Sequence, residues 1–86
     1  MSPSAPVVSG RSVVAALERA GFERRGQRGS HLKLRHPDSG RTVIVPLHSE
    51  LAPGTLASVC RQAGWSLPEL QLHLASRRRE RPSPER

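Results

Sequence analysis

The chain has 86 residues, enough for one small domain with a thin hydrophobic core. Hydrophobic residues make up 35% and aromatic residues 2%, so Val, Leu, Ile and Ala must form the core, and a binder that stacks bases on a row of aromatic rings is disfavoured. The net charge of +7, from 14 Lys and Arg against 7 Asp and Glu, favours nucleic acid or an acidic protein as partner. Part of this excess positive charge lies in the C-terminal tail, where its role can be limited to solubility.

The two ends of the chain differ in composition from its centre. Residues 1–8 are rich in Ser and Pro and are predicted to be flexible, with the domain spanning residues 9–75. Residues 76–86 form a basic tail with two prolines and no apolar anchor, so disorder is expected there. Such a tail can hold RNA loosely by charge, but a solvated tail is the simpler interpretation.

The cellular location follows from what the sequence lacks. Cys60 is the single cysteine, so it cannot form an internal disulfide, and a core thiol in a reducing compartment is expected. No stretch has the length of a membrane span. The first residues lack the charged start and apolar centre of a signal peptide. We therefore expect a cytoplasmic protein with no membrane partner.

The first half of the chain predicts one helix followed by two strands. A helix should begin at Ser9 or Gly10, because apolar residues recur at helical spacing after it, and Gly21 is placed to end it. Residues 22–26 are predicted as a short strand, followed by RGQRG as a turn. The alternating run SHLKLRH then predicts a second strand.

The second half predicts one more strand and two helices. RTVIVPL is a β-branched strand that should pair with the preceding one as an antiparallel hairpin. A helix with one apolar stripe is expected from Pro53 to Gly64. Ser66 and Glu69 have the spacing of a capping box and predict a short C-terminal helix. The fold class is therefore α+β with the order α-β-β-β-α, in which helices cover one face of a three-stranded antiparallel sheet.

Alternation in the second strand separates two kinds of side chain. If Leu32 and Leu34 face the helices, then His31, Lys33 and Arg35 face outward. Such a face attracts phosphate. A histidine beside phosphate-binding cations suits RNA cleavage, in which a base removes the 2′-hydroxyl proton and an acid protonates the leaving 5′ oxygen. On position alone, however, an inert surface histidine is the better interpretation of His31.

The residues around this strand start carry weaker signals. Arg28, Gly29 and Ser30 can supply phosphate contacts or simply form a turn. His48 follows the third strand and is either a second proton-transfer group, a substrate contact or an ordinary loop histidine. Arg28, Gly29, Ser30 and His48, with Lys33 and Arg35, are the predicted RNA contacts.

Other patterns of catalysis are not visible in the sequence. His36 and His73 are predicted to be surface residues. No glycine loop for phosphates and no metal-ligand spacing occurs, and Asp38 and Glu50 lie in different loops. A two-metal nuclease is therefore disfavoured, and no metal or other cofactor is expected.

Four short motifs follow one another along the chain. They are Gly-Phe at 21–22, Gly-Ser-His at 29–31, Pro-x-His at 46–48 and Gly-Thr-Leu at 54–56. Their order and spacing are fairly specific, although each is weak alone. From about Ser9 to Leu74 the chain resembles the HicA-type mRNA interferase toxins, also called YcfA-like proteins, of toxin–antitoxin systems.

This resemblance implies a double-stranded-RNA-binding-like fold and metal-independent cleavage of RNA that arrests translation and growth. The catalytic histidine of that family is the one in Gly-Ser-His, which is His31 in this sequence. The resemblance also implies neutralisation by a HicB-type antitoxin, and no direct readout of DNA is expected. Two alternatives stay open: a non-catalytic RNA-binding module of the same fold, in which His31 only contacts phosphate, and a basic adaptor for an acidic protein.

Overall fold

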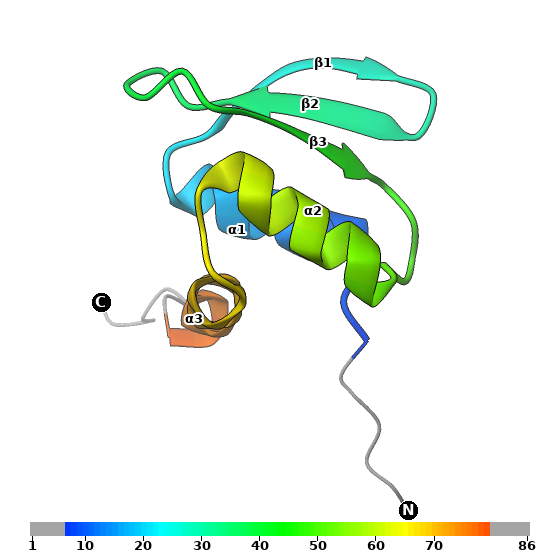
Figure 1. The fold of residues 1–86 in the computed structure, drawn as a ribbon, viewed down its shortest axis with the longest axis vertical. Coiled ribbons are helices and arrows are strands. Elements are labelled where there is room, and N and C mark those ends of the chain that lie inside the picture. Colours follow the sequence, from blue (N-terminus) through cyan, green and yellow to red (C-terminus); the bar gives the residue numbers. More distant parts are fainter. Residues whose placement is uncertain (1–6, 80–86) are drawn as a thin grey trace, which may run out of the picture.

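The computed structural model describes residues 7–79 and shows one sheet and three helices. The sheet forms one layer, α1 and α2 pack beneath it, and α3 is seen end-on on the side of the helices away from the sheet (Figure 1). The predicted α+β class and the α-β-β-β-α order with an added C-terminal helix are thus confirmed. The elements are α1 (Gly10–Arg19), β1 (Glu23–Arg28), β2 (His31–Arg35), β3 (Thr42–Pro46), α2 (Pro53–Ala63) and α3 (Leu67–Arg79).

The three strands pair antiparallel in the order β1-β2-β3, so β2 is the central strand. On one side His31 lies opposite Arg28 of β1, and on the other it lies opposite Pro46 of β3. The register of β1 shifts between Arg24 and Gly26, which places an irregularity in this edge strand. The helices cover one face of the sheet and leave the other face to solvent (Figure 1).

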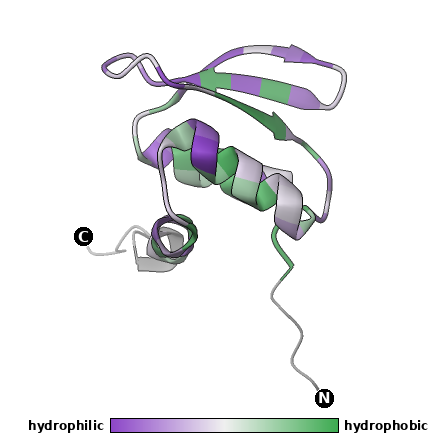
Figure 2. Ribbon diagram, viewed as in Figure 1, coloured by the Kyte–Doolittle hydropathy of each residue, from purple (hydrophilic) through white to green (hydrophobic). Residues whose placement is uncertain are grey.

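One hydrophobic core lies between the sheet and the helices. β2 buries Leu32 and Leu34 and exposes the residues between them, as the sequence predicts, and β3 buries Val43 and Val45. Figure 2 shows this alternation as hydrophobic and hydrophilic bands along β2. The core cluster consists of Val13, Val14, Leu17, Phe22, Leu32, Leu34, Val43, Val45, Leu51, Val59 and Ala63.

The ends of α1 and α2 lie where capping chemistry places them. Ser9 caps α1, because its hydroxyl oxygen accepts a hydrogen bond from the Ser12 amide at 3.1 Å. Gly21 follows α1 at a φ of +105°, and Gly64 caps α2 at a φ of +80°, both in a region that favours glycine. Pro53 opens α2. The observed boundaries of α1 and α2 therefore agree with the helix starts and ends predicted from the sequence.

α3 is longer than the sequence predicts. The capping box is present: the Ser66 amide donates to Glu69 Oε1 at 2.6 Å, and the Glu69 amide donates to Ser66 Oγ at 3.2 Å. The helix then spans 13 residues to Arg79, so residues 76–79, assigned above to the tail, are helical. Arginine is a good helix former, which favours continuation of an anchored helix. The rest of the predicted tail lies outside the described residues.

The N-terminal segment is attached to the domain earlier than Ser9. Val8 is partly buried against the core, and its carbonyl oxygen accepts a hydrogen bond from the Leu51 amide at 2.8 Å. The flexible segment predicted for residues 1–8 therefore does not include Val8. Residues 1–6 lie outside the described part of the chain.

β1 also extends beyond its predicted limits. It begins at Glu23 and runs through Arg28, so the predicted turn RGQRG is wrong, and only Gly29 and Ser30 turn between the strands. All six residues of β1 are exposed. A strand without buried residues leaves no hydrophobic alternation in the sequence, which explains why its second half was missed.

No helix within residues 7–79 combines the length and the apolar character that crossing a membrane requires.

The start of α1 approaches the end of β3 so closely that only glycine fits. A Cβ on Gly10 would overlap the carbonyl oxygen of Pro46, whereas a Cβ on Gly54, in the first turn of α2, would meet nothing within 4 Å. We expect Gly10→Ala to lower the free energy of unfolding by about 1–3 kcal/mol. Gly54→Ala should leave it unchanged or raise it by about 0.4–1 kcal/mol. Chemical denaturation measures both, and equal stability of the two variants would contradict the close approach.

Candidate active site

The outer face of the sheet gathers the cationic residues that the sequence singled out. His31, Lys33 and Arg35 are all exposed on β2, on the opposite side from Leu32 and Leu34. Directly opposed residues of an antiparallel pair share a face, so Arg28, opposite His31, also belongs to it. The predicted outward placement of these side chains is confirmed. Pairing adds that Arg28 is the cross-strand neighbour of His31.

Acidic residues lie away from the His31 end of this face. Glu23 lies opposite Arg35, at the other end of β2, and is 3.9 Å from Arg25. Glu18 on α1 pairs with Arg24 at 2.8 Å. Within residues 7–79, neither Arg28 nor Lys33 forms an ion pair. The positive potential is therefore least compensated beside His31, where an anion would bind best.

A two-residue turn presents His31 at the start of β2. Gly29 has a φ of +58° and Ser30 does not have a positive φ, as in the hairpin turn that places glycine first. The Gly29 carbonyl oxygen accepts from the Gln27 side chain at 3.0 Å, and the Ser30 carbonyl oxygen accepts from the Leu47 amide at 2.6 Å. Gly29 thus has a structural reason for its identity, and the turn is fixed on the β3 side.

His48 lies next to His31, although the two come from different segments. Their ring centroids are 6.4 Å apart and the rings meet at 71°. Both side chains are exposed. The His48 carbonyl oxygen accepts a hydrogen bond from the Gly10 amide at 2.9 Å, so the start of α1 fixes its backbone. The structure therefore brings together two of the candidate residues that the sequence could only name separately.

The other two histidines lie elsewhere and are not simple surface residues, which corrects the prediction for both. His36 is partly buried and meets Phe22 edge-on at 5.1 Å. His73 is partly buried and stacks on Trp65 at 4.1 Å, and Trp65 in turn meets Phe22 at 6.2 Å. This aromatic cluster of Phe22, His36, Trp65 and His73 joins α3 to the end of β2 opposite His31. The sequence did not reveal it because its members come from four separate segments.

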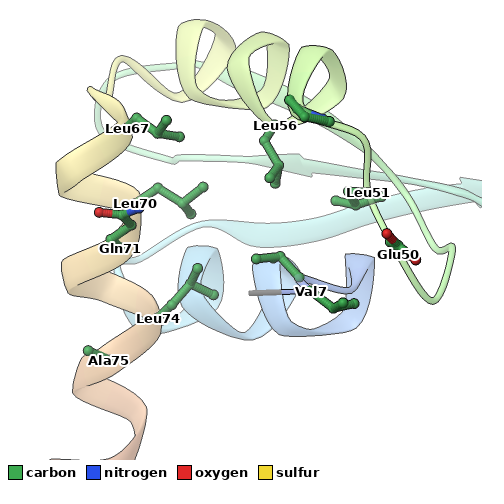
Figure 3. Close-up of a pocket in the computed structure, with 11 residues that line it drawn as sticks. Val7, Glu50, Leu51, Leu56, Leu67, Leu70, Gln71, Leu74 and Ala75 are labelled. Atoms are coloured by element: carbon green, nitrogen blue, oxygen red, sulfur yellow. The ribbon is translucent and has the colours of Figure 1, made fainter. Parts of the chain in front are cut away.

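An apolar groove lies on the helical side of the molecule, away from the sheet. It has a volume of about 720 Å³ and is formed by the segment before α1, the loop before α2, α2 itself and α3. Figure 3 shows leucines from the loop before α2, from α2 and from α3 around the groove, with Val7 of the segment before α1 and with Glu50 at one end. It was not predicted, because only the packing of α3 creates it. Apart from Glu50 at its end, the lining of the groove offers no proton-transfer group.

The remaining reactive groups are not placed for catalysis. Cys60 is only 4% exposed; burial, with a smaller contribution from the negative charge of Glu69, raises the pKa of its thiol. It is therefore a protonated core residue at neutral pH. Asp38 and Glu50 lie in separate loops, and within residues 7–79 no three His, Cys, Asp or Glu side chains are grouped so as to hold a metal ion.

The order of elements and the antiparallel sheet define a small α+β domain of α-β-β-β-α order with an added C-terminal helix and an exposed cationic sheet face. A family model described as the HicA toxin of bacterial toxin–antitoxin systems matches residues 10–65. The chain belongs to this family, and it is thus a toxin whose class works with an antitoxin. Comparison with curated proteins gave no match. The predicted resemblance extended to Leu74, whereas the match ends at Trp65, so α3 lies beyond it.

The stacked pair of Trp65 and His73 should hold α3 against the rest of the domain. We expect His73→Ala to weaken this attachment by about 1 kcal/mol, because a stacked ring contact is lost. Hydrogen exchange of the α3 amides measures it, and protection should fall. Leu72→Ala is the matched control, since its side chain is 70% exposed on the same helix. Equal protection in both variants would show that the stack does not hold α3.

Proposed function

We propose that this toxin is an endoribonuclease, an mRNA interferase that needs no metal and arrests translation and growth in the cytoplasm. The observation that carries the proposal is the outward placement of His31 beside Arg28 and Lys33 on a face free of helices. Membership of the HicA family supports it. A HicB-type antitoxin is the proposed neutralising partner.

The proposed reaction uses the 2′-hydroxyl of RNA as the nucleophile. It attacks the adjacent phosphorus, the bond to the 5′ oxygen breaks, and the products are a 2′,3′-cyclic phosphate and a 5′-hydroxyl. One proton must leave the 2′-hydroxyl and one must reach the 5′ oxygen, and His31 exchanges one of these protons. Positive side chains stabilise the charge that develops on the phosphoryl oxygens. This chemistry requires a 2′-hydroxyl, so DNA cannot be cleaved.

The proposed RNA contacts surround His31 on the same face. Arg28 lies directly opposite it across the hairpin, and Lys33 and Arg35 follow it on β2. Gly29 and Ser30 bring exposed backbone within the same turn, and His48 borders it on the β3 side. Such contacts to phosphate position the strand without reading its sequence. The antitoxin is proposed to cover this face, because a cover there blocks both RNA binding and His31.

The first test removes the imidazole of His31. We expect His31→Ala to abolish cleavage of RNA by the purified protein in buffer containing a metal chelator, and to relieve growth arrest in cells. Stability should change by no more than about 0.5 kcal/mol, because the side chain is exposed. Retained RNA and antitoxin binding serve as controls. Full cleavage by the variant would falsify the catalytic role, and a wild-type protein that binds RNA without cleaving it would favour the non-catalytic module.

The second test concerns the cations of the outer face. We expect Lys33→Ala combined with Arg35→Ala to weaken RNA binding and to reduce the slope of log affinity against log salt by roughly one to two, because two phosphate contacts are lost. Arg61→Glu is the matched control: it lowers the net charge by the same amount, but from an exposed site on α2. The readout is the dissociation constant at several salt concentrations. If the slope of log affinity against log salt falls equally in both variants, net charge rather than this face governs RNA binding.

A further inference from the structure

We propose that His48 is the second proton-transfer group of the site and forms an acid–base pair with His31. This inference rests on the proposed ribonuclease function and extends it. Cleavage by attack of the 2′-hydroxyl moves two protons, one off the nucleophile and one onto the leaving group. A single histidine that takes the first proton ends the step protonated, and the departing 5′ oxygen still needs a donor close at hand.

The two rings lie close enough to serve one phosphodiester. A proton-transfer group must come within about 3 Å of the atom that it serves. With centroids 6.4 Å apart and both side chains exposed, the two rings are close enough to contact the same phosphodiester when it binds on this face. The attacking and leaving oxygens lie on opposite sides of phosphorus in an in-line displacement. His31 comes from β2 and His48 from the loop after β3, so the two rings belong to different segments and can serve different oxygens of one phosphodiester.

The backbone of His48 is fixed by two neighbours, so its position does not depend on a free loop. Gly10, at the start of α1, donates its amide hydrogen to the His48 carbonyl oxygen at 2.9 Å. The preceding residue, Leu47, donates to the Ser30 carbonyl oxygen at 2.6 Å. Ser30 immediately precedes His31, so the same hydrogen bond links the two histidine-bearing segments. This positioning is what a pair of catalytic groups requires before substrate arrives.

Other described side chains near His31 are poor candidates for the second role. Arg28 stays charged at any relevant pH and cannot exchange a proton. Glu23 lies opposite Arg35, at the far end of the outer face. Glu50 borders the apolar groove on the helical side. Lys33 is a cation two residues along β2, placed among phosphate contacts. Within residues 7–79, His48 is therefore the group whose chemistry and place both fit.

The balanced step assigns one proton to each ring. The neutral histidine takes the 2′-hydroxyl proton as the 2′ oxygen bonds to phosphorus. The protonated histidine gives its proton to the 5′ oxygen as that bond breaks. Their protonation states are reversed after the step, and hydrolysis of the cyclic phosphate by water in the opposite sense restores them. Apart from this water molecule, the cycle consumes only RNA.

The test uses a leaving group that needs no acid. An RNA oligonucleotide carries one cleavage site, first mapped with wild-type protein, and a matched oligonucleotide has sulfur in place of the 5′ oxygen at that site. A thiolate leaves without protonation because thiols are far more acidic than alcohols. Wild-type protein, His31→Ala and His48→Ala are each measured on both substrates. His48→Gln is added, since it keeps a hydrogen-bonding side chain but cannot exchange the proton.

We expect both His48 variants to lower kcat on the oxygen substrate by about 10²- to 10⁴-fold. The sulfur substrate should restore cleavage either by the His48 variants or by His31→Ala. The histidine whose loss the sulfur substrate compensates is the general acid. The bell-shaped dependence of kcat/KM on pH in the wild type should lose one limb in each variant. Unfolding midpoints of the variants report on the fold.

Three results would overturn the pair: wild-type kcat in His48→Ala, a rise in KM with unchanged kcat, or failure of the sulfur substrate to restore either variant. The first two would leave His48 as a spectator or a contact for RNA. Wild-type protein that leaves the oxygen substrate intact would overturn the proposed ribonuclease function itself. The wild-type arm therefore tests the function, and the variant arms test the pair.

Discussion

Burial of Leu32 and Leu34 against the helices is the constraint on which the rest of the site depends. Each leucine contributes about 1.5–3 kcal/mol by leaving water, and both are at most 3% exposed. Side chains alternate along a strand, so this burial forces His31, Lys33 and Arg35 outward. A slip of one residue would turn Lys33 inward, at a cost that no contact there offsets. The composition of the outer face thus follows from the packing of the inner one.

The second constraint is the junction between α1, β3 and the hairpin turn. Gly10 lies so close to Pro46 that no side chain fits, and its amide fixes the backbone of His48. Pro46 in turn lies opposite His31 in the sheet. The start of one helix, the end of one strand and the start of another therefore meet at one place. Catalytic pairs need this kind of support, because side chains in unsupported loops do not hold a productive geometry.

The sequence was sufficient for the features that leave a local pattern, and insufficient for those that depend on pairing. The alternation of β2, the stops at Gly21 and Gly64 and the capping box of α3 were all correct, since each arises from residues within one turn or one strand. The second half of β1 was missed because none of its side chains is buried. The proximity of His31 and His48 depends on strand register and on the loop after β3, which local patterns do not encode.

The two ends of the sheet have different roles. The residues that stabilise the domain lie at one end, and the residues of the proposed chemistry lie at the other. At one end, Phe22, Trp65 and His73 join α3 to the domain by ring contacts, and α3 adds the buried Leu70. At the other end, His31 and His48 are exposed and contribute little burial. The family match covers residues 10–65, which include both exposed histidines but not α3. The hydrogen bonds from Gly10 to His48 and from Leu47 to Ser30 likewise join residues within that match. The region that matches the family model therefore contains the hydrogen bonds that hold the His48 segment beside His31, whereas α3 stabilises the domain from the opposite end.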